Sequence, residues 1–129
     1  MKFGTYFAYW EKDWDTDYIK YVKKVADLGF DVLEVGAAGI VNMSDEQLFA
    51  LKSEAEKFNI TLTAGIGLPK EYDVSSLDED VRQNGIAFMK RILDALYKAG
   101  IHAIGGTIYS YWPADYTSPI NKPEVRKQS

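Results

Sequence analysis

Residues 19–35 read IKYVKKVADLGFDVLEV and hold a helix, a turn and a strand in succession. Ile19, Val22 and Val25 share one helical face, and Gly29 stands where a left-handed helix end favours glycine. The segment after it is rich in β-branched residues, as strands are. A helix that leads into a strand through so short a turn is typical of parallel α/β folds.

The same succession recurs along the whole chain. The sequence predicts strands over residues 3–9, 31–35, 60–66 and 101–109. It predicts helices over residues 17–28, 45–58 and 77–99. Capping boxes at residues 44–47 and 76–79 mark the starts of the second and third helices. The order βαβαβαβ, with about 30 residues per unit, predicts an α/β fold that is half of a (β/α)8 TIM barrel.

The last residues have the pattern of a fourth helix. Asn121 can act as its N-cap, and Pro123 and Glu124 lie in the first turn, where both are favoured. Such a helix needs about ten residues to cover its strand pair, and Ser129 comes earlier. We therefore expect residues 1–129 to form a single half-barrel domain that stops inside an element.

Composition narrows the classes of function. The 129 residues include 15 Lys or Arg and 19 Asp or Glu, so the formal net charge is −4. The absence of a basic cluster argues against nucleic-acid and anionic-membrane partners. Apolar runs are far shorter than the roughly 18 residues of a membrane span. With no cysteine and no secretion signal at the amino terminus, we expect a cytoplasmic protein with a small-molecule or protein partner.

Aromatic residues gather at two places. Ten of them, including all three tryptophans, fall within residues 3–14 and 109–116. Both stretches cover a predicted strand end and the loop after it, which is where parallel α/β folds bind ligands. Sugar C–H surfaces stack on such rings, so the pattern favours a carbohydrate site. Alternatively, the rings plug a barrel mouth or an interface.

Glycines mark the same ends of two predicted strands. Gly65 and Gly67 close the third strand, and Gly105 and Gly106 interrupt the fourth. They permit close backbone approach or fill a crowded interior. Residues 63–67 also resemble part of a dinucleotide fingerprint, but the third glycine is missing and no helix opens directly after them.

Two titratable residues are candidates for a role in catalysis or binding. His102, the only histidine, begins a predicted strand at the end away from the proposed site, which favours a structural or surface role. Glu34, near the end of its strand, could serve acid or base chemistry if it is buried, or could pair with a lysine. These residues do not assemble a divalent metal site, and no nucleophile stands with a base.

Four segments together resemble the amino-terminal half of the ketose 3-epimerases, the D-tagatose and D-psicose (D-allulose) 3-epimerases. They are MKFGTYFAYWEKDW (1–14), VADLGFDVLEVGAAGI (25–40), ITLTAGIG (60–67) and IHAIGGTIYSYWPADY (101–116). SYWPADY after a Gly-Gly strand is the most specific of these signals. The resemblance implies a xylose-isomerase-like barrel and a manganese or cobalt ion. It also implies C3 epimerisation of a free ketohexose through an enediolate, with a pair of glutamates.

Carried over position by position, the resemblance implies substrate-binding roles for Tyr6, Trp14, Gly67, Gly105, Gly106 and Trp112. In that family both catalytic glutamates and all four metal ligands come from strands five to eight. The resemblance therefore implies no catalytic residue and no metal ligand among these 129 residues, and Glu34 matches no catalytic position.

Two classes of function follow. The first is half of a ketose 3-epimerase, inactive alone, which is either a truncated form or acts with a complementary carboxy-terminal half. The second is a noncatalytic half-barrel that binds a sugar or assembles with itself. Another xylose-isomerase-like isomerase remains an alternative. Because a half-barrel leaves strand edges and its interior open, we expect a homodimer or larger assembly.

Overall fold

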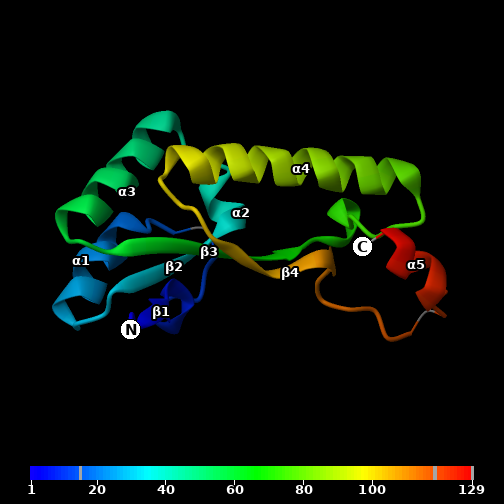
Figure 1. Cartoon of the computed structure of the whole chain (residues 1–129), viewed down its shortest axis with the longest axis horizontal. Coiled ribbons are helices and arrows are strands. Elements are labelled where there is room, and N and C mark those ends of the chain that lie inside the picture. The colour runs from blue at the N-terminus through cyan, green and yellow to red at the C-terminus, as the bar shows by residue number, and fades with distance from the viewer. Residues whose placement is uncertain (15, 118, 129) are drawn as a thin grey trace. The chain divides into compact units, whose positions relative to one another are not determined.

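The computed structural model of the chain describes residues 1–14, 16–117 and 119–128 (Figure 1). Within these residues one four-stranded sheet has the order β1 (Gly4–Tyr6), β2 (Val32–Gly36), β3 (Thr61–Leu68) and β4 (Ile104–Tyr111). The helices are α1 (Ile19–Asp27), α2 (Ala37–Ile40), α3 (Asp45–Lys57), α4 (Glu79–Lys98) and α5 (Lys122–Gln128). Two 3-10 turns, η1 (Phe7–Tyr9) and η2 (Lys70–Tyr72), complete the description. The predicted α/β order is confirmed.

Several boundaries differ from the predicted ones. Residues 7–9 form η1 and not the end of a strand, because the backbone N–H of Trp10 turns back to donate to the carbonyl of Phe7 at 3.1 Å. The helix predicted from residue 77 is capped by Asp78, whose Oδ1 accepts the backbone N–H of Asp80 at 3.0 Å. The predicted box at 76–79 is therefore misplaced by two residues. The box that opens α3 is confirmed, with both reciprocal hydrogen bonds between Ser44 and Gln47.

Each of three helix-to-strand connections turns through one left-handed residue. Gly29, Asn59 and Gly100 have φ angles of +82°, +53° and +70°. After each, the next N–H reaches back to the carbonyl five residues earlier, as in Phe30 to Val25 at 3.1 Å. This is the Schellman geometry, which satisfies carbonyls left open at a helix end. The end predicted at Gly29 is confirmed.

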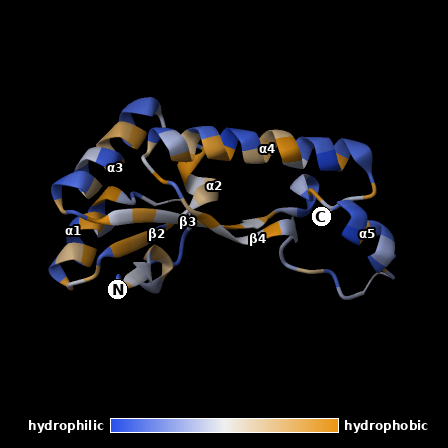
Figure 2. Ribbon diagram, viewed as in Figure 1, coloured by the Kyte–Doolittle hydropathy of each residue, from blue (hydrophilic) through white to orange (hydrophobic). Residues whose placement is uncertain are grey.

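The chain forms two compact units by its contacts. The first unit comprises Met1–Gly65 and Ile92–Ile104, and the second comprises Ile66–Arg91 and Gly105–Ser129. In the first unit β2 pairs in parallel with both β1 and β3. α1 contacts both α3 and β2 there. Figure 2 shows hydrophobic and hydrophilic residues alternating along α1 and α3, as amphipathic helices require.

The strands of the first unit have one apolar face and one polar face. The buried side chains of β2 and β3 there are Leu33, Val35, Leu62 and Ala64. The other face, which we call the inner face, carries Tyr6, Glu34, Thr63 and Gly65, none of them buried. Tyr6, Glu34 and Thr63 are aligned by the parallel register across β1, β2 and β3. The alternation follows from the two-residue period of a strand.

The second unit has its own small core. Tyr72 stacks on Phe88 of α4, with ring centroids 4.2 Å apart and planes at 16°. Leu68 and Ser75 are fully buried there.

None of the helices within the described ranges combines the length and apolar character that a membrane crossing requires.

Candidate functional site

The carboxyl end of β1 leads into an aromatic cluster in the first unit. Tyr6 ends the strand, Phe7 begins η1, and Trp14 lies in the connection to α1. The Trp14 ring centroid lies 6.2 Å from that of Tyr6 and 6.0 Å from that of Phe7. Phe7 is fully buried, whereas Trp14 stays 64% exposed. The structure thus brings Tyr6 and Trp14 together and leaves the indole accessible to a ligand.

Glu34 lies beside Tyr6 on the inner face. The two residues are partners in the register of β1 and β2. Burial raises the pKa of the Tyr6 phenol, and the negative charge of Glu34 raises it further. A Cβ at Gly65 would come within 2.8 Å of Glu34 Oε1, so the glycine leaves room for the carboxylate. No ion pair of Glu34 with a lysine is found among the described residues. The exposed side chain instead offers hydrogen-bond acceptors beside a phenol.

Trp112, in the second unit, lies against Gly67. A Cβ at Gly67 would meet the Trp112 Cβ at 3.0 Å and its Cδ1 at 3.2 Å. The backbone N–H of Trp112 donates to the carbonyl of Leu68 at 2.7 Å. The absence of a side chain at Gly67 therefore lets the indole approach the strand, and Trp112 is 58% exposed.

Gly105 and Gly106 differ in what surrounds them. Nothing lies within 4 Å of a Cβ built at Gly105. Gly106 has φ +101°, and its Cβ would overlap the carbonyl oxygen of Ile66. Close backbone approach explains Gly106, while Gly105 leaves open space next to β4.

A buried polar group holds the end of β4, and the sequence analysis did not identify it. Asp73 Oδ1 accepts the backbone N–H of Ser75 at 2.9 Å and its hydroxyl at 2.7 Å. The Ser110 hydroxyl lies 3.0 Å from that of Ser75. Ser110 precedes Trp112 by two residues, so this group steadies the end of the strand just before the indole. Polar residues in a loop give no sequence signal of burial.

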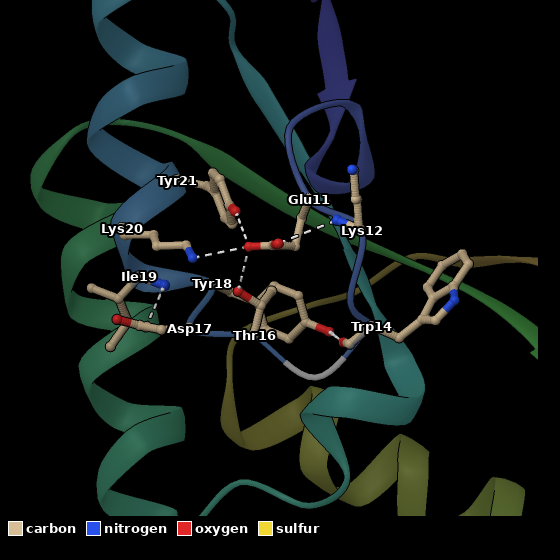
Figure 3. Close-up of polar contacts among 9 residues, drawn as sticks. All are labelled: Glu11, Lys12, Trp14, Thr16, Asp17, Tyr18, Ile19, Lys20 and Tyr21. Atoms are coloured by element: carbon tan, nitrogen blue, oxygen red, sulfur yellow. Dashed lines mark hydrogen bonds and ion pairs between the residues drawn. The ribbon is translucent and has the colours of Figure 1, made fainter.

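A second polar group surrounds Glu11 in the first unit (Figure 3). Its Oε2 accepts hydrogen bonds from the Tyr21 hydroxyl at 2.7 Å, Lys20 Nζ at 3.0 Å and the Thr16 hydroxyl at 3.1 Å. These bonds, with Tyr21 the largest contributor and the Lys12 N–H the smallest, lower the pKa of Glu11 to about 2. In the sequence, residues 11–15 (EKDWD) resemble a charged, solvent-exposed segment. The sequence analysis therefore did not identify this cluster.

The Glu11 carboxylate is expected to titrate near pH 2, and its ordinary value is 4.5. Since the native pKa is depressed, the hydrogen bonds contribute fully to folding stability above the unfolded-state pKa. That contribution is lost as the pH falls through about 2. Tyr21→Phe removes the largest contributor and should move the midpoint upward, toward 4.5. Carbon-detected NMR of the Glu11 carboxyl measures this, with Tyr97→Phe as the control that leaves the midpoint unchanged. A wild-type midpoint near 4.5 would contradict the assignment.

His102 belongs to the first unit and precedes β4, which begins at Ile104 and not at the predicted residue 101. It is exposed and lines a groove of about 590 Å³ together with Lys52, Glu56, Thr61 and Tyr97. No group of three or more His, Cys, Asp or Glu side chains among the described residues is placed to hold a metal ion.

Comparison with known proteins bears on the fold and on the family resemblance. Residues 22–128 match the sequence pattern of the family described as "Xylose isomerase-like TIM barrel". The chain is 50% identical over 122 residues to the D-psicose 3-epimerase of Ruminiclostridium cellulolyticum, covering 95% of this chain and 42% of that protein. It is 46% identical over 122 residues to the D-psicose 3-epimerase of Agrobacterium fabrum, with the same coverage.

Solved structures agree with these sequence relatives. The crystal structure of a D-psicose 3-epimerase from Clostridium cellulolyticum with D-tagatose superposes with a TM-score of 0.96 at 48% identity, covering 99% of this chain and 44% of that one. A second D-psicose 3-epimerase, crystallised in the presence of D-fructose, gives 0.95 at 44% identity, with the same coverage. The chain thus spans 42% to 44% of the length of these relatives. The predicted half-barrel and the resemblance to ketose 3-epimerases are confirmed.

Proposed function

The chain belongs to the xylose isomerase-like TIM barrel family, and we propose that it supplies the amino-terminal, sugar-binding half of a ketose 3-epimerase. The observation that carries the proposal is 50% identity to a D-psicose 3-epimerase over 95% of the chain. The reaction would be reversible inversion at C3 of a free ketohexose in the cytoplasm. Residues 1–129 would work in it as one half-barrel domain.

In this proposal the chain's own residues bind and orient the sugar. Tyr6, Trp14 and Trp112 would offer ring faces to its C–H surfaces, because stacked rings exclude water from an apolar patch. Gly67 would keep the Trp112 indole close to the strand. Gly105 and Gly106 would leave the floor of the pocket free of side chains.

The manganese or cobalt ion that the resemblance implies does not fit the residues present. Residues 1–14, 16–117 and 119–128 hold no cluster of three carboxylate or imidazole ligands. Divalent ions of this kind need several such ligands at once. The contribution proposed for this chain is therefore confined to binding, and the partner we propose is a complementary carboxy-terminal half. Without that carboxy-terminal half, the open edges of β1 and β4 favour a homodimer or larger assembly.

A hybrid enzyme tests the proposal. Residues 1–129 would replace the matching part of the Ruminiclostridium cellulolyticum enzyme, and conversion of D-fructose to D-psicose would be assayed with manganese. We expect the hybrid to epimerise and residues 1–129 alone not to. Trp112→Ala in the hybrid should raise KM about tenfold, which corresponds to a loss of about 1.4 kcal/mol of binding free energy. The effect on kcat should be smaller, because the sugar stacks on the ring before the chemical step.

The matched control is Tyr97→Ala, which removes an aromatic ring that is 76% exposed on α4. It should leave both kinetic constants unchanged. A hybrid with a native circular dichroism spectrum but no activity would contradict the proposed function. An unchanged KM in Trp112→Ala would remove Trp112 from the sugar site. Light scattering on residues 1–129 alone reports the assembly, and a monomer mass of 14.6 kDa would contradict that part.

A further inference from the structure

The carbonyl oxygen of Trp14 accepts a hydrogen bond from a buried tyrosine. Tyr18 stands just before α1 and is 1% exposed. Its hydroxyl donates to the carbonyl oxygen of Trp14 at 2.8 Å and lies 3.3 Å from the carbonyl oxygen of Gly36 (Figure 3). A buried hydroxyl keeps such a partner, since leaving it unpaired is unfavourable.

Two glycines make the slot that this phenol enters. A Cβ at Gly36 would come within 2.9 Å of the Tyr18 hydroxyl, and one at Gly39 would overlap it. Phe7 packs edge-on against the same ring, with centroids 4.9 Å apart. The position of the Tyr18 hydroxyl is therefore fixed by surrounding atoms, and so is the carbonyl to which it donates.

The Glu11 cluster ties the same connection to α1 on both sides of the tryptophan. Glu11 precedes Trp14, and Thr16, which donates to its carboxylate, follows it. Tyr21 and Lys20, which also donate to the carboxylate, belong to α1. A charged acceptor with several donors makes stronger and more directional bonds than a neutral one.

The Trp14 side chain itself is mostly free. Its contacts with Tyr6 and Phe7 leave the indole 64% exposed, although its carbonyl accepts the Tyr18 hydroxyl and the Glu11–Thr16 hydrogen bond spans the segment that contains it. A ring that is already placed loses less conformational freedom when a ligand stacks on it. Such preorganisation acts on the binding step and leaves the chemical step alone.

We propose that Tyr18 and Glu11 are positioning residues that hold the Trp14 indole ready for the apolar face of a ketose. This inference rests on the proposed function and extends it from the residues that touch the sugar to those that place them. Tyr18→Phe removes one hydroxyl and keeps the ring, while Glu11→Gln removes the charge and keeps the shape.

The test labels residues 1–129 and the hybrid enzyme with 5-fluorotryptophan. Fluorine NMR then resolves Trp14, assigned by the loss of its signal in Trp14→Phe. In both variants we expect this signal to shift and its relaxation to report faster motion. In the hybrid, the KM for D-fructose should rise about fivefold to tenfold, with kcat within about twofold. Tyr97→Phe and Glu56→Gln, made at exposed positions, are the matched controls and should change neither readout.

The outcomes separate the two proposals. An unchanged Trp14 signal in both variants overturns the positioning role, whether or not the hybrid is active. A KM that rises equally in the controls overturns it too. If Tyr18→Phe fails to fold by circular dichroism, Glu11→Gln decides, since Glu11 acts through surface hydrogen bonds. A mobile Trp14 in the variants of an inactive hybrid supports the positioning role and contradicts the proposed function.

Discussion

Phe7→Ala is expected to lower the free energy of unfolding by about 3–5 kcal/mol, the range for removing a fully buried phenylalanine ring. Phe7 is 0% exposed, so the alanine would leave a cavity. The rings of Tyr6, Trp14 and Tyr18 lie with centroids 4.8, 6.0 and 4.9 Å from its own, so all three would lose a partner. Against a domain stability of about 5–15 kcal/mol, this is one of the largest single losses available.

Urea denaturation followed by far-UV circular dichroism measures the loss. Phe7→Leu is the matched control, because it keeps most of the apolar volume and should cost less than about 1.5 kcal/mol. With Trp10 and Trp112 both replaced by Phe, the remaining Trp14 fluorescence should shift to longer wavelength in Phe7→Ala as the indole loses its support. A loss below about 1 kcal/mol would mean that surrounding side chains refill the space, and that the cluster is not held by Phe7.

Gly106→Ala should destabilise the protein by about 3 kcal/mol or more. Left-handed or otherwise positive φ angles cost a non-glycine residue about 1–3 kcal/mol, and Gly106 has φ +101°. Steric overlap adds to that strain, because the new methyl group would run into the Ile66 carbonyl oxygen, a backbone atom that cannot rotate away.

The neighbouring glycine provides an internal control. Gly105→Ala places a methyl group where nothing lies within 4 Å, so stability should stay within about 1 kcal/mol of wild type. Thermal and urea unfolding of the two variants in parallel measures the difference. In the hybrid enzyme Gly105→Ala should still raise KM, because the methyl group would enter the proposed pocket floor. Equal stabilities for the two variants would contradict the backbone geometry described for Gly106.

Most of the architecture could be predicted because it depends on local patterns. The α1 face, its end at Gly29 and the capping box of α3 are short-range features, written within a few residues of one another. The boundaries that were wrong depend on longer-range or competing bonds. Residues 7–9 have strand-like composition, yet they form η1, where the Phe7 ring packs edge-on against the Trp14 and Tyr18 rings. α2 has the sequence AAGI, too short for a periodic signal.

The residues of the candidate site also fall into two groups, those that a local sequence pattern predicts and those that it does not. Tyr6 and Trp14 could be found because aromatic residues cluster after a strand. Tyr18, Glu11 and Asp73 could not, because their importance lies in hydrogen bonds formed only once the chain has folded. Asp73 contacts a serine 37 positions away, and Tyr18 reaches the carbonyl of a glycine 18 positions away. Their side chains, read in sequence, are indistinguishable from solvated polar residues.

The polar inner face has a consequence for how such a protein folds. Parallel strands pair only across crossover connections of a dozen or more residues, so one face of such a sheet can stay open to water while the rest of the fold forms. A face made of Glu34, Thr63 and Gly65, with Tyr6 at its edge, stays hydrated during that stage. Large apolar side chains on that face would be exposed at the same stage and would make a partly folded chain prone to aggregate. Polar residues on this face therefore limit the apolar surface that a partly folded chain exposes.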